Sequence, residues 1–366
     1  MNVRRGSHDL LRQYQQEPGG EAAACMGNCL VRQQGFFAQL VIISAFVFAT
    51  IGCAAHTSRS AQRDFQVPLV RADLSSSATD YHLPAPVSHP EVLPPLSNSD
   101  TVHFELVLLD RTVQIAPGIK YRAWTFNGSV PGPVMHVKVG DTIDISLTNK
   151  ALMGHSIDFH AALAPPDVAY QTVQPGKTLH FSWVAKYPGA FLYHCGTPPV
   201  LAHISNGMYG AIIVDPPGGW GEAAQQFVFV QSEFYPSLYP GSTTDYYGDF
   251  RKMKTGMADI VTFNGMAFQY KTNPLPIKVG ELVRAFVIDA GPSHFSAFHV
   301  VGTVFSRVLI EGNPHNELVG IQTLNIPPGG GAVAEFTVQQ EGVYPVVTHS
   351  FGDADNGAMG LFRAAK

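Results

Sequence analysis

Apolar and polar residues alternate in short runs along the chain from residue 101 onward. A period of two is typical of a β-strand with one buried face, because successive side chains point to opposite faces of a sheet. Gly, Pro, Asp and Asn separate the runs, and short strands at regular spacing indicate a sandwich or barrel. The pattern predicts an all-β protein. Its predicted strands include residues 104–109, 134–139, 142–147, 178–183 and the apolar run 210–215.

The same pattern occurs twice in the chain. Phe126-Asn-Gly128 recurs as Phe263-Asn-Gly265. Lys138-Val-Gly-Asp-Thr-Ile143 recurs as Lys278-Val-Gly-Glu-Leu-Val283. Self-similarity at an offset of about 140 residues indicates two copies of one structural unit. We therefore predict two domains, at residues 101–218 and 219–366.

The first 100 residues differ in composition. Residues 40–51 are almost wholly apolar, about the length of a signal-peptide core and short for a membrane-spanning helix. Thr50-Ile-Gly-Cys53 looks like a lipobox, so we expect residues 1–53 to be a leader and Cys53 to be lipidated. An ordinary cleaved signal or an uncleaved anchor remains an alternative. Residues 54–100, rich in Ser, Ala and Pro, are interpreted as a tether.

Charge and cysteine content narrow the function. The chain has 366 residues, and its 23 Lys and Arg against 28 Asp and Glu give a net charge of −5 without a basic block. This balance gives no support to a nucleic-acid partner. Of the four cysteines, Cys25, Cys29 and Cys53 lie in the predicted leader, where Met26 is a more ordinary start than Met1. Cys195 is then the only cysteine in the mature fold, and metal ligation explains an unpaired thiol in an oxidising compartment.

Cys195 belongs to a cluster of residues that can bind a metal. His203 follows it by eight positions, Met208 follows it by thirteen, and His155 lies upstream. A lone Cys is most often a small buried hydrophobe. One thiolate, two imidazoles and a thioether, however, form the ligand set of a mononuclear blue-copper site, with Met as the weak axial ligand. The cluster predicts such a copper site.

A second set of residues is expected on the strand face opposite the ligands of the first copper. His194 is adjacent to Cys195, so on a strand its side chain lies on the opposite face. The same parity applies to residues 155–160 if that segment is extended. His155 then faces the first copper, while Asp158 and His160 share the other face. Each of the two segments thus sends one ligand to the first metal and one His the opposite way, which suggests a second metal site.

The second copy keeps only part of this set. Ser350 stands where Cys195 stands in the first copy, so no blue-copper site is expected there. His299 and His349 are the counterparts of His160 and His194. A satisfied core histidine is the alternative interpretation of each, and their shared register with the first copy argues against it.

These motifs resemble those of the copper-containing nitrite reductases over about residues 100–366. The resemblance implies two tandem cupredoxin-like Greek-key β-sandwich domains. The short spacing between Cys195 and His203, together with the lipobox, is similar to the lipid-anchored outer-membrane subgroup. It implies a location in the periplasm or outer membrane of a Gram-negative bacterium. The matching segments are residues 155–160, Tyr193-His-Cys195 with His203 and Met208, Phe298-His-Val-Val-Gly302 and Thr348-His-Ser350.

The resemblance also implies roles for individual residues. Asp158 and His299 would handle protons, and Val301 would lie over the substrate; His294 receives no role. Two coppers per chain are implied, a type 1 copper that accepts electrons and a type 2 copper that binds nitrite. The type 1 copper would be held by His155, Cys195, His203 and Met208, and the type 2 copper by His160, His194 and His349.

The implied reaction converts nitrite to nitric oxide and water with one electron and two protons. A small donor protein, either a cupredoxin or a c-type cytochrome, would reduce the type 1 site, and the electron would pass through Cys195 and His194 to the type 2 site. In the family, the counterpart of His349 comes from the neighbouring subunit, so we expect a homotrimer.

Two other functions remain to be compared. An electron carrier with an inert second domain would need only the type 1 ligands, and it leaves His160, His194 and His349 unexplained. A two-domain multicopper oxidase would need His-x-His pairs for a trinuclear cluster, and none occurs among the 15 histidines.

Overall fold

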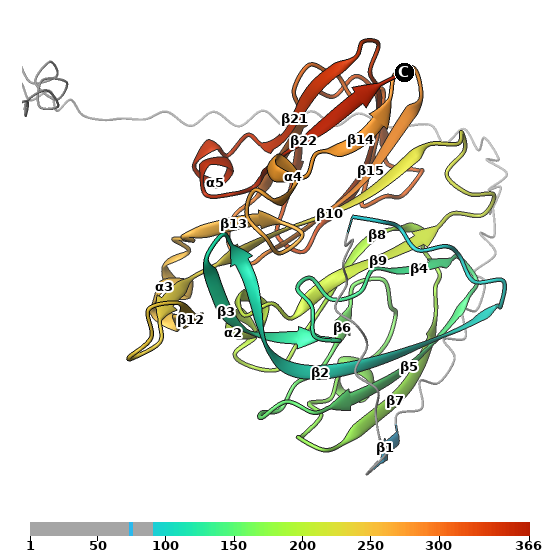
Figure 1. Cartoon of the computed structure of the whole chain (residues 1–366). Coiled ribbons are helices and arrows are strands. Elements are labelled where there is room, and N and C mark those ends of the chain that lie inside the picture. The colour runs from blue at the N-terminus through green and yellow to red at the C-terminus, as the bar shows by residue number, and fades with distance from the viewer. Residues whose placement is uncertain (1–72, 76–90) are drawn as a thin grey trace, which may run out of the picture. The chain divides into compact units, whose positions relative to one another are not determined.

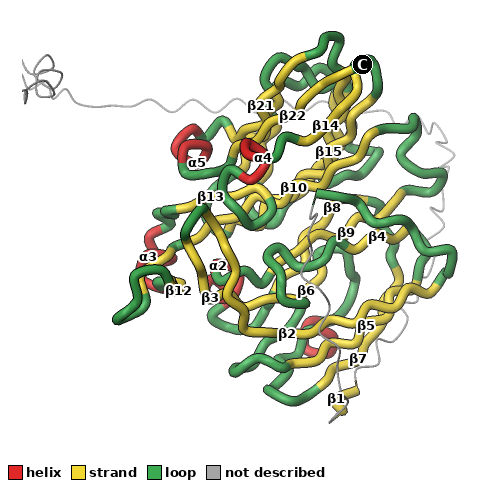
Figure 2. Tube along the Cα trace, viewed as in Figure 1, coloured by secondary structure: helices red, strands yellow, loops and turns green. Residues whose placement is uncertain are grey.

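The computed structural model describes residues 73–75 and 91–366. Strands make up about half of this part of the chain, and the helices are short (Figure 2). The prediction of an all-β fold with two tandem cupredoxin-like sandwiches is confirmed. The expected leader and most of the expected tether lie outside the described residues. Among the described residues, the structure has no helix with the length and apolarity needed to cross a membrane.

The first sandwich has a seven-stranded and a four-stranded sheet (Figure 1). The larger sheet has the order β1-β7-β5-β2-β3-β12-β11, and the smaller sheet has the order β4-β9-β8-β6. The larger sheet comprises β1 (Asp73–Ser75), β2 (Thr101–Ala116), β3 (Ile119–Phe126), β5 (Thr142–Asn149), β7 (Thr178–Val184), β11 (Pro236–Leu238) and β12 (Asp245–Gly248). The smaller sheet comprises β4 (Met135–Lys138), β6 (Asp158–Phe159), β8 (Gly189–His194) and β9 (Tyr209–Asp215).

The second sandwich has a six-stranded and a five-stranded sheet, ordered β13-β10-β15-β20-β17-β18 and β14-β22-β21-β16-β19. The six-stranded sheet comprises β10 (Gln225–Phe234), β13 (Ile260–Phe263), β15 (Leu282–Gly291), β17 (Arg307–Ile310), β18 (Glu317–Leu318) and β20 (Gly331–Thr337). The five-stranded sheet comprises β14 (Leu275–Lys278), β16 (Ser296–Val300), β19 (Leu324–Ile326), β21 (Gly342–Thr348) and β22 (Met359–Ala365).

Short helices lie in the connections between strands. Two of them occupy matching places, because α2 and α5 each follow the strand that carries a predicted ligand and each end in Asn-Gly. The described helices are α1 (Pro166–Ala169), α2 (Val200–Ser205), α3 (Phe250–Thr255), α4 (Gln269–Thr272) and α5 (Phe351–Asp355).

Each sandwich encloses its own apolar core. The first core joins side chains such as Ile145 on β5 and Phe159 on β6. The second core joins side chains such as Phe229 on β10 and Phe298 on β16. Alternation along β5 and β7 puts every second residue into the core, as the sequence pattern predicts. Burial of these side chains is the main stabilising term of each sandwich.

A third apolar cluster joins the two sandwiches. Leu192 and Ala211, from the outer face of the four-stranded sheet, pack with residues such as Val230 and Phe286 of the six-stranded sheet. All seven residues of β9 are therefore buried, which confirms the prediction of a buried strand at 210–215. At Gly331 a Cβ atom would lie 1.9 Å from the Ala190 carbonyl oxygen, so only glycine permits this close approach of β20 to β8.

Two segments pack outside the domain or tether to which the predicted bounds assign them. Strand β12 pairs with β3 and so extends the seven-stranded sheet of the first sandwich with residues from beyond position 219. The end of the expected tether is also packed: Leu93 contacts the third cluster, and the Glu91 carbonyl accepts a hydrogen bond from the Val228 amide. The boundary at 218–219 stays a prediction.

Candidate copper centres

Three predicted ligands converge at one end of the first sandwich. His155 Nδ1 lies 3.0 Å from His203 Nδ1, and Cys195 Sγ lies 3.1 Å from the same His203 atom. Their ligand atoms all lie within 4.8 Å of one another, and all three side chains are buried. One thiolate and two imidazole nitrogens at such spacing can share a single small cation. The geometry therefore brings together three of the four residues that the sequence predicts for the first copper.

The local backbone explains how this set forms. Cys195 follows the last residue of β8, and α2 then carries His203 back toward it. Gly207 adopts φ +108°, a conformation that favours glycine, and a Cβ there would lie 2.6 Å from the Val130 side chain. This turn returns the chain so that the Cys195 amide donates to the Met208 carbonyl at 3.0 Å. Met208 is fully buried in the same apolar cluster as Cys195.

The electrostatics suit metal binding. Burial, and then the neighbouring His203, lowers the pKa of His155 to about 3, and burial lowers the pKa of His203 to about 4. Both rings are therefore neutral near pH 7, the form that donates a lone pair to a metal. Burial raises the pKa of the Cys195 thiol, although amide and hydroxyl donors around it act in the other direction. A bound cation supplies the charge that a buried thiolate needs.

A second pair of histidines faces the opposite way, as the parity argument predicts. Asp158 pairs with His194 across β6 and β8, so both side chains lie on the same face of the sheet. His160 Nε2 lies 3.0 Å from His194 Nε2. Each of these rings uses its other nitrogen to contact a carbonyl oxygen, His160 at Gly329 and His194 at Cys195.

This arrangement leaves two lone pairs facing each other. A carbonyl oxygen only accepts hydrogen bonds, so both Nδ1 atoms carry the proton and both Nε2 atoms of the neutral rings carry a lone pair. Two such atoms at 3.0 Å need a proton or a cation between them. Burial, and then the neighbouring His194, lowers the pKa of His160, so a shared proton is disfavoured. The pair fits a metal ion.

The remaining predicted residues lie in the second sandwich. The ring centroids of His299 and His349 are 5.0 Å apart, and His299 Nδ1 donates to the Gln322 carbonyl. Val301 is 42% exposed at the end of β16. Within residues 73–75 and 91–366, His349 does not join His160 and His194 in a group of three ligands. The predicted residues of the second site thus lie in two separate groups, His160 with His194 in the first sandwich and His349 with His299 in the second.

Known proteins share this architecture and these motifs. A family model described as a multicopper oxidase matches residues 109–219. A copper-containing nitrite reductase of Neisseria gonorrhoeae is 34% identical over 343 residues, which cover 88% of this chain and 86% of the relative. One from Neisseria meningitidis serogroup A is 36% identical over 288 residues, covering 76% and 74%. The solved copper nitrite reductase of Nitrosomonas europaea matches with a TM-score of 0.68 at 34% identity, covering 73% and 94%.

The chain belongs to the copper-containing nitrite reductases. It is an enzyme of this class, and copper is its cofactor. The chemistry of the donor set agrees, because a Cys thiolate with two His nitrogens and a buried Met is a set that selects copper. The electron-carrier and multicopper-oxidase alternatives are not favoured.

Two residues of the reductase's first centre were not anticipated. The Ser156 amide donates to Cys195 Sγ at 3.3 Å, and the Ser156 hydroxyl accepts from the Gly196 amide at 3.0 Å. Trp124 on β3 packs its ring against His203, with centroids 4.8 Å apart. Trp124 precedes the repeated Phe126-Asn-Gly128 motif by two positions, and Ser156 adjoins His155. Neither position carries a sequence signal for a role at copper.

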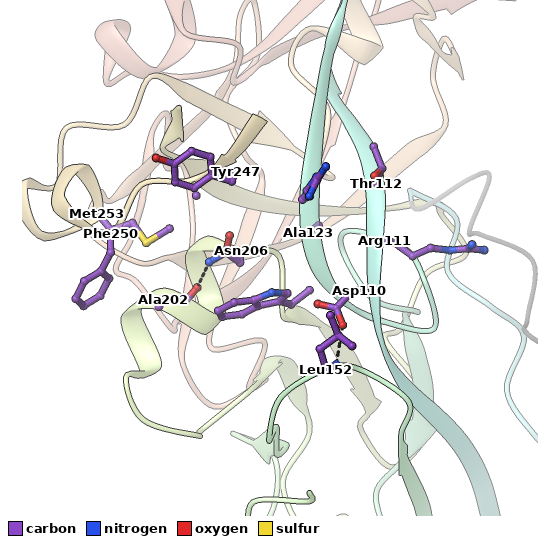
Figure 3. Close-up of a pocket in the computed structure, with 13 residues that line it drawn as sticks. Asp110, Arg111, Thr112, Ala123, Leu152, Ala202, Asn206, Tyr247, Phe250 and Met253 are labelled. Atoms are coloured by element: carbon purple, nitrogen blue, oxygen red, sulfur yellow. Dashed lines mark hydrogen bonds between the residues drawn. The ribbon is translucent and has the colours of Figure 1, made fainter. Parts of the chain in front are cut away.

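A pocket of about 430 Å³ lies beside this centre, and Trp124 is part of its lining (Figure 3). Figure 3 shows Phe250 and Met253 on the α3 side of the pocket, Ala202 and Asn206 on α2, and Thr112 on β2. Leu152, at the rim, is 89% exposed. The pocket thus connects the solvent to a ring that contacts a copper ligand.

Proposed function

We propose that this reductase converts nitrite to nitric oxide and water, consuming one electron and two protons. The observation that carries the proposal is the back-to-back arrangement of two ligand sets on adjacent residues, Cys195 and His194. His155, Cys195, His203 and Met208 would hold a type 1 copper, and His160, His194 and His349 would hold a type 2 copper. Copper at these sets would supply the redox chemistry, with electron acceptance at the first set and nitrite binding at the second.

The polar residues around these two groups of histidines have separate tasks. Asp158 shares the His194 face, where the carboxylic acid form of its side chain can donate a hydrogen bond to nitrite and deliver that proton. His299 lies beside His349, and an imidazole ring can act as a general acid, so it can supply the second proton. Val301 adds an apolar wall that excludes water from the substrate. The peptide link between His194 and Cys195 is the shortest covalent connection between the two ligand sets.

The reaction is tested by two measurements on the purified protein. We expect two coppers per chain and nitric oxide release when nitrite and a reductant are supplied. One copper per chain without nitric oxide would instead identify an electron carrier, since the carrier needs only the first set of ligands.

We further propose that the second copper site is completed between chains. His349 carries the third imidazole, yet it does not join His160 and His194 within the described chain. A head-to-tail contact that closes into a ring can bring the His349 group of one subunit against the His160 group of the next. A homotrimer of this kind has three shared sites.

Complementation between two inactive variants tests the shared site. His160→Ala and His349→Ala are each expected to be inactive alone and to regain activity when co-expressed. A mixed trimer contains an interface at which the His349 variant offers His160 and the other variant offers His349. A site built within one chain cannot be rescued in this way. Activity that stays at the level of the separate variants, despite proven subunit mixing, would eliminate the shared-site proposal.

The pocket at Trp124 supports a route for electrons. A small donor protein, a cupredoxin or a c-type cytochrome, needs an apolar surface that brings its redox centre close to the acceptor. Leu152 and Phe250 at the pocket rim are exposed apolar side chains next to a ring that contacts His203. We place electron entry there. Leu152→Asp should weaken the reaction with a protein donor and leave the reaction with dithionite unchanged.

The location of the enzyme is the last part of the proposal. The lipobox at Thr50-Ile-Gly-Cys53 supports a lipid anchor on Cys53, in the periplasm or outer membrane of a Gram-negative bacterium. Cys53→Ser should move the protein from the membrane fraction to the soluble fraction. Retention in the membrane fraction would favour the uncleaved anchor.

A further inference from the structure

The second sandwich contains a counterpart of the first copper centre in which the ligands have been replaced. In the first centre, the Met208 amide donates to the His203 carbonyl, and α2 ends at Asn206-Gly207. In the second, the Ala358 amide donates to the Asp353 carbonyl, and α5 ends at Asn356-Gly357. Asp353 is thus the structural counterpart of His203, and Ala358 that of Met208. His294 is the counterpart of His155 in the repeat.

Helix α5 and the segment that carries His294 are in contact, as their counterparts are in the first centre, but here a hydrogen bond joins them. His294 Nδ1 lies 2.8 Å from Asp353 Oδ1, and His294 Nε2 lies 2.5 Å from the Gly256 carbonyl oxygen. A carbonyl oxygen and a carboxylate both accept hydrogen bonds, so the ring satisfies both contacts only when both nitrogens carry a proton. The geometry requires a charged histidine, and charge-assisted hydrogen bonds are the stronger kind.

The surroundings favour that charge. Burial opposes it, but the acidic groups Glu233 and Asp353 outweigh the burial and raise the pKa of His294. Glu233 on β10 also accepts the His294 amide at 2.6 Å and the Tyr235 hydroxyl. Asp289 on β15 completes the acidic group, and α3 contributes Lys252, whose ammonium is held by Asp259.

The hydrogen bonds of His294 to Asp353 and to the Gly256 carbonyl form the His294 clamp. Helix α3 connects this clamp to the first copper centre. Gly256 is the residue at which α3 ends, and Met253 in the same helix packs with Ala202, Tyr235 and Trp124. Ala202 adjoins the copper ligand His203, and the Trp124 amide donates to the Asn206 carbonyl at the end of α2. The His294 ring therefore links the C-terminal end of α3, and with it the α3 wall of the pocket, to the second sandwich.

We propose that protonated His294 is a positioning residue that holds the α3 wall of the Trp124 pocket, so that this wall loosens when the ring loses its proton. The inference rests on the proposed function only in giving the pocket a role in electron entry. Because the pKa of His294 is raised above its ordinary 6.5, the clamp is fully formed below that pH. It is lost as the pH rises through the pKa of the folded protein.

Hydrogen exchange in the copper-loaded enzyme tests the proposal. Peptides that cover α3 and the Trp124 amide are followed from pH 6 to pH 9, with each rate divided by its intrinsic value. We expect the protection of both peptides to fall by roughly tenfold or more as the pH rises, because a hydrogen bond to a charged group is lost. In His294→Gln, protection should be low at pH 6 and independent of pH.

A matched control separates this effect from general alkaline loosening. His103 forms a 2.7 Å pair with Asp144 in the first sandwich, away from α3. His103→Gln should keep the wild-type pH profile of both peptides. A wild-type profile without a pH step, or a His294→Gln profile that matches the wild type, would overturn the proposal. Neither outcome depends on nitrite turnover, so failure here is distinct from failure of the proposed reaction.

Discussion

The region around His155 in the first sandwich and the region around His294 in the second share one backbone arrangement but differ in side-chain chemistry. In the first sandwich, His155 lies in a buried cluster with Cys195 and His203, where burial and the neighbouring His203 lower its pKa to about 3. In the second, His294 lies against Asp353 and Glu233, and its pKa is raised. The difference teaches that the neighbours of the histidine, rather than the fold, decide whether it binds a metal or bears a charge.

The two regions also differ in how far the residue at the Cys195 position is buried. Cys195 is fully buried, while its counterpart Ser350 is exposed. A buried thiolate without a cation is costly, so the first region is stable only with a metal or with a neutral thiol. The second region holds a hydrogen-bonded pair of His294 and Asp353 in the corresponding place.

The most severe test removes the thiolate. Cys195→Ala should abolish the intense visible absorption and the turnover that depends on a protein donor, since no thiolate remains to bind the first copper strongly. Absorption spectra and turnover assays measure this. A variant that keeps its strong visible band would show that Cys195 is not the ligand.

A smaller loss is expected at the proton-handling residues. Asp158→Asn and His299→Ala should each lower nitrite turnover by ~10²–10⁴-fold, the usual contribution of a general acid. Copper analysis should still find both metals, because neither residue is a ligand. The visible band, intact in both variants, serves as the control. Near-normal turnover in either variant at pH 7 would contradict the assigned role.

The pH dependence of stability should have a defined sign at the first centre. In copper-free protein the lowered pKa values of His155 and His203 lie below 6.5, so their contribution is present above pH 6.5 and lost as the pH falls toward 4 and 3. At about 1.4 kcal/mol per pKa unit, the total is on the order of several kcal/mol. Thermal unfolding from pH 7 to pH 4 measures it.

His155→Leu should flatten this dependence of stability on acid pH. The control variant His103→Gln removes only the exposed pair of His103 with Asp144, so it should leave the dependence unchanged. Copper loading should raise the midpoint of unfolding near pH 7, because the folded state binds the metal more tightly than the unfolded chain does. An acid slope in His155→Leu as steep as in the wild type would show that other groups carry it.

The mildest change is made in the second sandwich. Ser350→Cys should alter neither the copper content nor the visible spectrum. The new thiol is exposed, and its neighbours are Asp353 and Ala358 where the first centre has His203 and Met208. Adding Asp353→His and Ala358→Met should then produce a second visible band. A band in the single variant would show that the thiol alone decides the site.

Much of this protein could be predicted from the sequence, because the relevant signals are local. Strand periodicity predicted the sandwiches, and the spacing of Cys195, His203 and Met208 predicted the first ligand set. Strand parity correctly separated His194 from Cys195, since it depends only on the alternation of side chains along an extended chain.

Only the tertiary structure revealed the contacts that join distant segments. The Gly329 carbonyl that orients His160 lies 169 residues away in the chain, and β12 extends a sheet of the other sandwich. Trp124 against His203 and His294 against the Gly256 carbonyl likewise depend on how strands and loops pack. No periodicity encodes such contacts, because they arise from shape and hydrogen-bond satisfaction between elements that are placed only when the whole chain folds.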